Sequence, residues 1–306
     1  MDPNTAVLNS TRCGTFPLTV LSCRWLLAAF ALLAVAGNVH TAEIAAPYVP
    51  TAPSVVERML EIAKVGPQDY VIDLGSGDGR INILAAKKHG ARGLGIEIDP
   101  QLVALATANA RTAGVSDRVS FYEGDLFAAD LSKATVVTIY LPKIATMKLR
   151  SALLELKPGT RIVSHAASMG EWTADHFEML DVKDRVRADA PIKTYIHFWI
   201  VPAKVAGNWR WSLPAGTGTL DYELTLSQQF QKISGTLRVG GREVALDEST
   251  LEGDRITLAY MAKVGGKALA HRLAGRVTGL SIAGTAELKE ERGPGPMKWN
   301  ATRVAR

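Results

Sequence analysis

The chain has 306 residues, of which 47% are hydrophobic and 21% charged, a globular composition that excludes a disordered or fibrous protein. The net charge of +5 arises from 35 Lys and Arg and 30 Asp and Glu without a cluster of basic residues, so we expect no nucleic-acid partner. The two cysteines, Cys13 and Cys23, lie close to the amino terminus. Their position excludes a disulfide scaffold, a cysteine-ligated zinc site and a cysteine nucleophile in the rest of the chain.

Residues 1–42 contain one long apolar stretch, residues 25–37, which follows Arg12 and Arg24 and includes a small-residue cleavage pattern at residues 34–36. This pattern predicts a secretory signal peptide. Two alternatives remain open: an uncleaved membrane anchor, because residues 16–37 are nearly long enough to span a bilayer, and a buried helix. With a signal or an anchor, we expect the folded part to be exported to the periplasm or tethered to a membrane.

Residues 43–202 alternate between helical and strand patterns, and we interpret them as one domain. The predicted strands cover residues 70–74, 93–98, 119–122, 135–141, 161–164 and 195–201. The first predicted helix begins at Ser54, and the later ones cover residues 80–88, 100–113 and 144–156. Strands separated by helices indicate an α/β fold with a Rossmann-like, mostly parallel and doubly wound sheet.

The pattern changes at residues 203–207, and residues 207–306 read as a second domain. Glycine-containing turns, such as residues 240–241, 253–254 and 265–266, separate short alternating segments. The predicted strands cover residues 209–213, 219–226, 232–239, 242–248, 255–260, 268–277, 280–287 and 298–304. So many short strands in about 100 residues predict a small antiparallel β-barrel or sandwich. Its aromatic residues are expected to fill or close the core; they are Trp209, Trp211, Phe230 and Trp299.

The most informative motif joins the first predicted strand of the α/β domain to the following helix. It reads Asp73-Leu74-Gly75-Ser76-Gly77-Asp78-Gly79-Arg80. Gly75 and Gly77 permit a tight turn and a close approach of the backbone to a ligand, and the loop amides could meet a carboxylate or a phosphate. The third glycine, Gly79, comes one position earlier than in the G-x-G-x-x-G fingerprint of NAD-binding sites.

Acidic side chains follow three successive predicted strands. Asp73, at the end of the first, could meet an ammonium group or order the glycine loop. Glu97 ends the second strand, where an acidic side chain can accept both hydroxyls of a ribose. Asp125 follows the third and can accept from the exocyclic amine of adenine while Leu126 packs on the ring. Without a Walker lysine, or an arginine beside Glu97, this pattern predicts a nucleoside site that lacks a phosphate clamp.

These residues resemble the class I S-adenosylmethionine-dependent methyltransferases over about residues 47–172. The segment Pro47-Tyr48-Val49-Pro50-Thr51, together with the glycine loop, is similar to a small family of seven-strand protein-lysine methyltransferases. That family includes the mitochondrial enzymes that methylate adenine nucleotide translocase and the ATP synthase c subunit, and it is distantly similar to the Dot1 histone-lysine methyltransferases. The resemblance implies that Tyr48 and Thr51 lie over the cofactor. The candidate cofactor-binding residues are Tyr48, Thr51, Asp73, Gly75, Ser76, Gly77, Asp78, Gly79, Glu97, Asp125 and Leu126.

The chain departs from that family in its apparent export signal, its added β domain and the end of its fourth predicted strand. This strand ends Tyr140-Leu141-Pro142, unlike the Asn/Asp-Pro-Pro-Tyr of many amide and base N-methyltransferases, which argues against nucleobase and glutamine acceptors. Tyr140 is the candidate catalytic residue on the acceptor side. The alternative is that Tyr140 only packs against the cofactor.

The sequence therefore predicts an S-adenosylmethionine-dependent methyltransferase that acts on a protein lysine amine. Two alternatives remain open. One is a small-molecule or lipid methyltransferase whose β domain holds the acceptor. The other is a non-catalytic binding protein, which the separation of an exported chain from a cofactor made in the cytoplasm would favour. His165, His176 and Asp175 match no familiar metal-ligand spacing, so we expect them to be structural and expect no metal cofactor.

Overall fold

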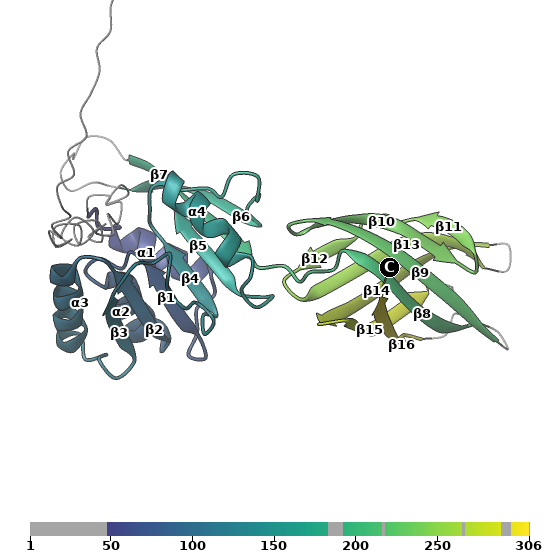
Figure 1. Cartoon of the computed structure of the whole chain (residues 1–306), viewed down its shortest axis with the longest axis horizontal. Coiled ribbons are helices and arrows are strands. Elements are labelled where there is room, and N and C mark those ends of the chain that lie inside the picture. Colours follow the sequence, from purple (N-terminus) through teal and green to yellow (C-terminus); the bar gives the residue numbers. More distant parts are fainter. Residues whose placement is uncertain (1–47, 183–191, 216–217, 265–266, 289–294, 306) are drawn as a thin grey trace, which may run out of the picture. The chain divides into compact units, whose positions relative to one another are not determined.

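The computed structural model describes residues 48–182, 192–215, 218–264, 267–288 and 295–305. The predicted signal or anchor, both cysteines, Pro47 and the predicted turn at residues 265–266 lie outside the described residues. Among the described residues, the model contains no helix with the length and apolar character needed to cross a membrane. The chain forms two separate sheets (Figure 1).

The first sheet has seven strands in the order β3-β2-β1-β4-β5-β7-β6. They are β1 (Tyr70–Leu74), β2 (Arg92–Glu97), β3 (Val119–Glu123), β4 (Val136–Ile139), β5 (Arg161–His165), β6 (His176–Val182) and β7 (Ile192–Ile200). Strands β1 to β5 pair in parallel, whereas β7 pairs antiparallel with β5 and β6. This confirms the predicted mostly parallel α/β sheet. Strand β6 was not predicted, because it lies at a sheet edge, where most of its side chains stay exposed or half-buried and no apolar run is needed.

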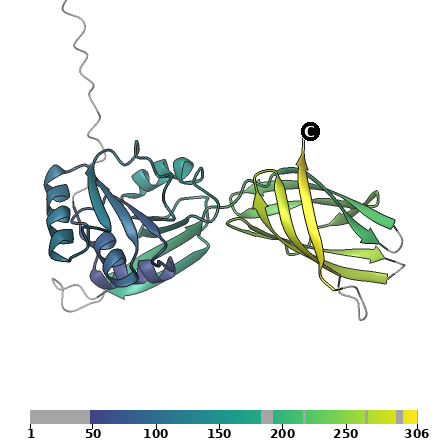
Figure 2. The same cartoon turned by 90° about the horizontal axis from the view of Figure 1, so that it is seen from below.

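The helices cover both faces of this sheet, which confirms the doubly wound arrangement (Figures 1 and 2). They are α1 (Pro53–Ile62), α2 (Arg80–His89), α3 (Pro100–Thr112) and α4 (Lys143–Leu153). Side chains alternate along each strand, so Val71 packs with α1 and α2 while Ile72 packs with α4 on the opposite face. Helix α3 packs beside α2 through Ala110 and Ala86.

The order of the strands determines where this sheet can bind a ligand. Strand β1 has β2 and β3 on one side and β4 and β5 on the other. The order in which strands are added to the sheet therefore reverses between β1 and β4. Open α/β sheets bind ligands in the crevice outside the carboxyl ends of the strands at such a switch point. Strand β4 ends at Ile139, so Tyr140 and Leu141, which were predicted to belong to the strand, lie just beyond it at this edge.

The second sheet has nine antiparallel strands in the order β11-β10-β9-β8-β16-β15-β14-β13-β12. They are β8 (Gly207–Ala215), β9 (Gly218–Gln229), β10 (Lys232–Val239), β11 (Arg242–Ala245), β12 (Thr250–Glu252), β13 (Arg255–Val264), β14 (Lys267–Thr278), β15 (Ser281–Leu288) and β16 (Met297–Val304). Eight of these correspond to the predicted strands, and β12 was missed because it has only three residues. The antiparallel all-β character is confirmed.

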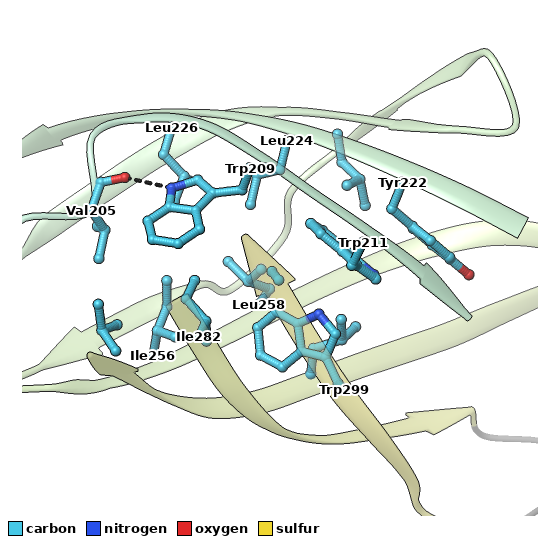
Figure 3. Close-up of a cluster of buried hydrophobic side chains, with 14 of the residues drawn as sticks. Val205, Trp209, Trp211, Tyr222, Leu224, Leu226, Ile256, Leu258, Ile282 and Trp299 are labelled. Carbon is cyan, nitrogen blue, oxygen red and sulfur yellow. Dashed lines mark hydrogen bonds between the residues drawn. The ribbon is translucent and has the colours of Figure 1, made fainter. Parts of the chain in front are cut away.

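One aromatic-rich core holds the second sheet together (Figure 3). Trp209, Trp211 and Trp299 are buried among leucine and isoleucine side chains, as predicted for these tryptophans. Trp209 Nε1 donates a hydrogen bond of 2.8 Å to the carbonyl oxygen of Val205, so its polar atom is satisfied inside the core. The core is therefore anchored directly before β8, at the point where the sequence pattern changes.

Candidate active site

The glycine loop lies at the carboxyl end of β1 and leads into α2. Gly75 and Gly77 have φ angles of +78° and +53°, in the left-handed region that glycine adopts without strain. A Cβ atom on Gly77 would lie 2.5 Å from Cε2 of Tyr48, and one on Gly75 would lie 3.0 Å from Cδ2 of Leu141. The ring of Tyr48 and the side chain of Leu141 therefore border the loop, and neither glycine has room for a side chain.

Two of the predicted site residues support this loop from behind. A Cβ atom on Gly79 would lie 2.5 Å from the ring of Phe121 and 2.9 Å from Cβ of Ala106, so the third glycine allows close packing on β3 and α3. The hydroxyl of Ser76 is buried against Gly95 of β2. The early position of Gly79 in the motif thus reflects packing of the loop.

The loop amides already have acceptors within the protein. The bonds are Gly75 N and Ser76 N to Ile96 O (2.9 and 3.0 Å), Gly77 N to Glu97 Oε2 (2.9 Å), Gly79 N to Ser76 O (2.9 Å) and Arg80 N to Asp78 Oδ1 (3.2 Å). Each of these five amides is therefore bonded within the protein.

The predicted carboxylates lie at the same edge of the sheet, in three different environments. Asp73 is buried, accepts a hydrogen bond of 2.6 Å from the hydroxyl of Thr138, and has its pKa raised by burial to about 7. Glu97 is oriented by the amides of Ile98 and Asp99, at 2.8 and 3.2 Å from Oε1, in addition to its bond from the loop. With a pKa of about 7, the Asp73 carboxyl can gain or lose its proton near neutral pH.

The third predicted carboxylate belongs to a turn after β3. Asp125 is exposed, and its Oδ1 accepts a hydrogen bond of 2.8 Å from the amide of Phe127. The next residue, Leu126, packs with Leu141 against the core on the α4 face of the sheet. Leu126 is half-buried next to the exposed Asp125 carboxylate, and the adenine site stays a prediction.

Arg80 ties the segment before α1 to the glycine loop. Its Nε and Nη2 donate to the two oxygens of Asp78 at 2.9 and 2.7 Å, and its Nη1 donates to the carbonyl oxygen of Thr51 at 2.7 Å. Burial alone would raise the pKa of Asp78, but the hydrogen bonds and the charge of Arg80 outweigh burial and lower it. Burial, with a smaller contribution from Asp78, raises the pKa of Tyr48. Tyr48 and Thr51 thus lie next to the loop, and their place over the cofactor stays a prediction.

Tyr140 lies directly after β4 and packs on a residue that sequence reasoning had assigned a structural role. The rings of Tyr140 and His165 are 4.0 Å apart and inclined by 31°. His165, the last residue of β5, is only 7% exposed, and burial lowers its pKa to about 4, so its ring is neutral at physiological pH. Its position in the sequence could have identified His165 as a site residue, because it ends a parallel strand at the edge that carries Asp73 and Tyr140.

The other residues considered for a metal site do not join His165. His176 lies on β6, with β7 between it and β5, and its Nε2 is 3.4 Å from Oε2 of Glu178. Within the parts of the chain that the structure describes, no group of three or more His, Cys, Asp or Glu side chains could hold a metal ion.

Comparison with known proteins identifies the family. The family model described as the ANTKMT methyltransferase domain matches residues 73–176. Over 140 residues the chain is 46% identical to a protein-lysine N-methyltransferase of Saccharolobus islandicus, covering 45% of this chain and 86% of the relative. The chain belongs to this methyltransferase family. The resemblance seen in the sequence is confirmed, and the cofactor of the enzyme is S-adenosylmethionine.

Mammalian relatives match the same part of the methyltransferase. The chain is 37% identical over 128 residues to the adenine nucleotide translocase lysine N-methyltransferase of Mus musculus. This match covers 41% of this chain and 55% of the relative. It is 32% identical over 137 residues to the mouse lysine N-methyltransferase of the ATP synthase c subunit, with 44% and 54% covered. The chain thus spans about half the length of these two relatives. A solved structure of an RNA methyltransferase from Salinibacter ruber with S-adenosylhomocysteine is 50% identical and covers 51% of this chain and 96% of its own, with a TM-score of 0.46.

The geometry of the methyltransferase site fits its cofactor. S-adenosylmethionine presents hydrogen-bond donors in its ammonium group, its ribose hydroxyls and its adenine amine, and its sulfonium is a cation. The carboxyl groups of Asp73, Glu97 and Asp125 offer hydrogen-bond acceptors at the ends of three adjacent parallel strands. The cofactor also carries an α-carboxylate, which would need donors other than these five loop amides, because they are bonded within the protein.

Proposed function

We propose that this methyltransferase transfers a methyl group to the ε-amine of a lysine in a protein. The observation that carries the proposal is the cluster of Tyr140, His165 and Thr51 at the edge beside the cofactor loop. Tyr140, the neutral His165 and the hydroxyl of Thr51 surround the end of β4 and β5. A lysine must lose its charge before its amine can attack, and surroundings without charge favour the neutral amine. The names of the relatives from Saccharolobus islandicus and mouse support a lysine acceptor.

The chemistry asks the chain mainly to align the two reactants. Bound S-adenosylmethionine supplies an electrophilic methyl group. The acceptor nitrogen forms its new bond to carbon as the carbon–sulfur bond breaks, the electron pair stays on sulfur, and one proton leaves the nitrogen. In this proposal Asp73, Glu97 and Asp125 hold the ammonium, ribose and adenine groups, and Tyr140 orients the incoming amine.

Exposed apolar side chains next to the loop support a protein acceptor. Tyr48 and Val49, on the segment before α1, are 44% and 54% exposed, and Ile144 in the first turn of α4 is 75% exposed. Tyr48 and Leu141 border the glycine loop, so these apolar side chains flank the proposed acceptor entrance. Exposed apolar side chains gathered beside a site are typical of a protein contact.

A transfer assay tests the proposed function. The purified full chain is incubated with S-adenosylmethionine carrying a radioactive methyl group and with a membrane-protein extract, the same extract with its lysines chemically blocked, or total RNA. We expect label in the unblocked protein only, with methyllysine found by mass spectrometry, and loss of transfer and cofactor binding in Glu97→Ala. Label in RNA, equal label in the blocked extract, or no label with the cofactor bound would each overturn the proposal.

The location of the chain is a separate proposal. We propose that it is exported or membrane-anchored through residues 25–37, supported by the signal-like pattern of that stretch. Fractionation of cells that produce the chain with a carboxyl-terminal tag tests this. Recovery of the tagged chain with soluble cytoplasmic markers would contradict it, and release from membranes by detergent alone would favour the anchor.

We also propose that the nine-stranded sheet closes into a small barrel. An isolated antiparallel bridge between Leu246, just after β11, and Tyr260 of β13 supports closure, because β11 is at one end of the strand order and β13 is next to the other end. Hydrogen exchange tests this. Protection of the β11 and β12 amides comparable to that of the central strands is expected, and rapid exchange of both would indicate an open sandwich-like edge.

A further inference from the structure

We propose that His165 is a positioning residue of the acceptor side, which holds the Tyr140 ring in place and links it to the segment that covers the cofactor loop. The inference rests on the proposed function, since it concerns the orientation of the acceptor amine. It assigns a role to the most buried polar ring at this edge of the sheet.

Three other parts of the chain meet at the His165 ring. Tyr140, after β4, packs against one face with ring centroids 4.0 Å apart. Nε2 lies 2.7 Å from the hydroxyl of Thr194 on β7, and Nδ1 lies 3.4 Å from the hydroxyl of Thr51 before α1. A neutral imidazole has one donor and one acceptor, so two hydroxyls can satisfy both of its nitrogens. The ring orientation is therefore determined from both sides.

The contact with Thr51 connects this ring to the cofactor side. Thr51 is buried, and its carbonyl oxygen accepts the 2.7 Å bond from Arg80, whose other nitrogens pair with Asp78 of the glycine loop. A displacement of His165 would thus be felt both by Tyr140 and by the segment over the loop. This continuity distinguishes the His165 ring from an ordinary core side chain.

The backbone next to His165 is specialised for this placement. Ala166 has a φ angle of +66°, which is costly for a residue with a Cβ atom, and its amide donates to the carbonyl oxygen of Tyr195 at 2.7 Å. The amide of Ala167 turns back to the carbonyl oxygen of His165 at 2.8 Å. Strain of this kind persists where the surroundings require one conformation. The positive φ of Ala166 ends β5, so His165 lies at the carboxyl edge of the parallel strands.

The neutrality of the ring suits its place. Burial lowers the pKa of His165 to about 4, so the ring adds no positive charge near a lysine amine that must be neutral or near a cationic cofactor. A lysine or arginine at this position would have repelled both. The ring thus supplies orientation and an aromatic surface without charge.

Ligand binding tests the inference without a known acceptor. Sinefungin differs from S-adenosylhomocysteine in carrying an amine-bearing carbon where the sulfur stands, so the ratio of their dissociation constants reports on groups around the transferred methyl. His165→Phe keeps a ring beside Tyr140 but removes both hydrogen bonds, and His165→Gln removes the ring. Thr194→Val removes only the 2.7 Å bond and serves if the histidine variants do not fold. His176→Phe, on exposed β6, is the matched control.

We expect His165→Gln and Tyr140→Phe each to reduce the preference for sinefungin by about three- to tenfold, the value of one or two hydrogen bonds. The double variant should lose little more than either single one, because both act on one arrangement. Binding of S-adenosylhomocysteine should change less than about twofold. An unchanged ratio in His165→Gln, or an equal loss of both ligands, overturns the inference. Failure of the wild-type chain to methylate lysine would overturn only the proposed function, because the ratio does not depend on an acceptor.

Discussion

Raising the pH from 6 to 8 is expected to strengthen binding of S-adenosylhomocysteine through a single carboxyl group. Burial raises the pKa of Asp73 to about 7, so about half of the free molecules hold a proton there at pH 7. A ligand ammonium group near this carboxyl favours its ionised form. Binding must therefore release the proton. At higher pH more of the free molecules have already lost this proton, so the affinity for the ligand rises.

The size of the effect follows from the pKa. With a pKa of about 7, Asp73 is ionised in about one molecule in ten at pH 6 and about nine in ten at pH 8. If only the ionised form binds, the affinity rises about tenfold over this interval. S-adenosylhomocysteine is the suitable ligand because its ammonium group stays protonated over this range.

Calorimetric titration measures the prediction. Titrations at pH 6, 7 and 8 give the affinity, and titrations in buffers of different ionisation enthalpy give the proton released, which we expect to be close to one below pH 7. Asp73→Asn retains an acceptor for the Thr138 hydroxyl but cannot ionise. It should bind more weakly and without this pH dependence. An affinity that does not vary with pH, or the same dependence in Asp73→Asn, would refute the assignment.

The same pKa predicts an opposite effect on the stability of the free protein. Between the ordinary value of 3.8 and about 7, the folded state holds a proton that the unfolded chain releases, so the free energy of unfolding falls as the pH rises. Asp73→Asn should therefore be more stable than wild type, by a margin that grows by about 2 to 3 kcal/mol between pH 5 and 8. His165, with its pKa lowered to about 4, contributes instability as the pH falls from 6.5 to 4. It contributes equally to both proteins, so it cancels from a urea-unfolding comparison.

Three further substitutions test the geometry. Gly77→Ala should weaken S-adenosylhomocysteine binding at least about tenfold, because its Cβ would lie 2.5 Å from the Tyr48 ring at a φ of +53°, whereas Gly66→Ala meets nothing within 4 Å and should not. Ala166→Gly should raise the free energy of unfolding by about 1 kcal/mol by relieving its positive φ, and a loss would contradict this. Trp209→Phe, lacking the donor to the Val205 carbonyl, should lower that free energy by about 1 to 3 kcal/mol; no change in urea unfolding would show the bond to be dispensable.

Most of the fold could be predicted from the sequence because its signals are local. Strands β1 and β10 were predicted with their observed bounds, since turn-forming residues flank alternating or apolar runs. Strands β6 and β12 were missed for different physical reasons. Strand β6 is an edge strand with little burial, and β12 is too short to show a period.

The candidate site also has a part that the sequence indicates and a part that it does not. Asp73, Gly77 and Glu97 could be recognised because parallel strands bring their carboxyl ends to one edge, so position along the chain already implies proximity. The partners of the loop amides could not be recognised, because Ile96 O and Glu97 Oε2 reach them from the neighbouring strand. These contacts between neighbouring strands leave no mark in a local sequence pattern.

The sequence by itself determined the α/β class, the glycine loop, the carboxylates after three strands and the family, because each is written in contiguous residues with a regular spacing. Only the tertiary structure decided the acceptor side. There Tyr140 and His165 meet with hydroxyls from residues 51 and 194, which are far apart in the chain. It also decided the charge states, since burial, which raises the pKa of Asp73 and lowers that of His165, is a property of everything packed around a group and of no local pattern.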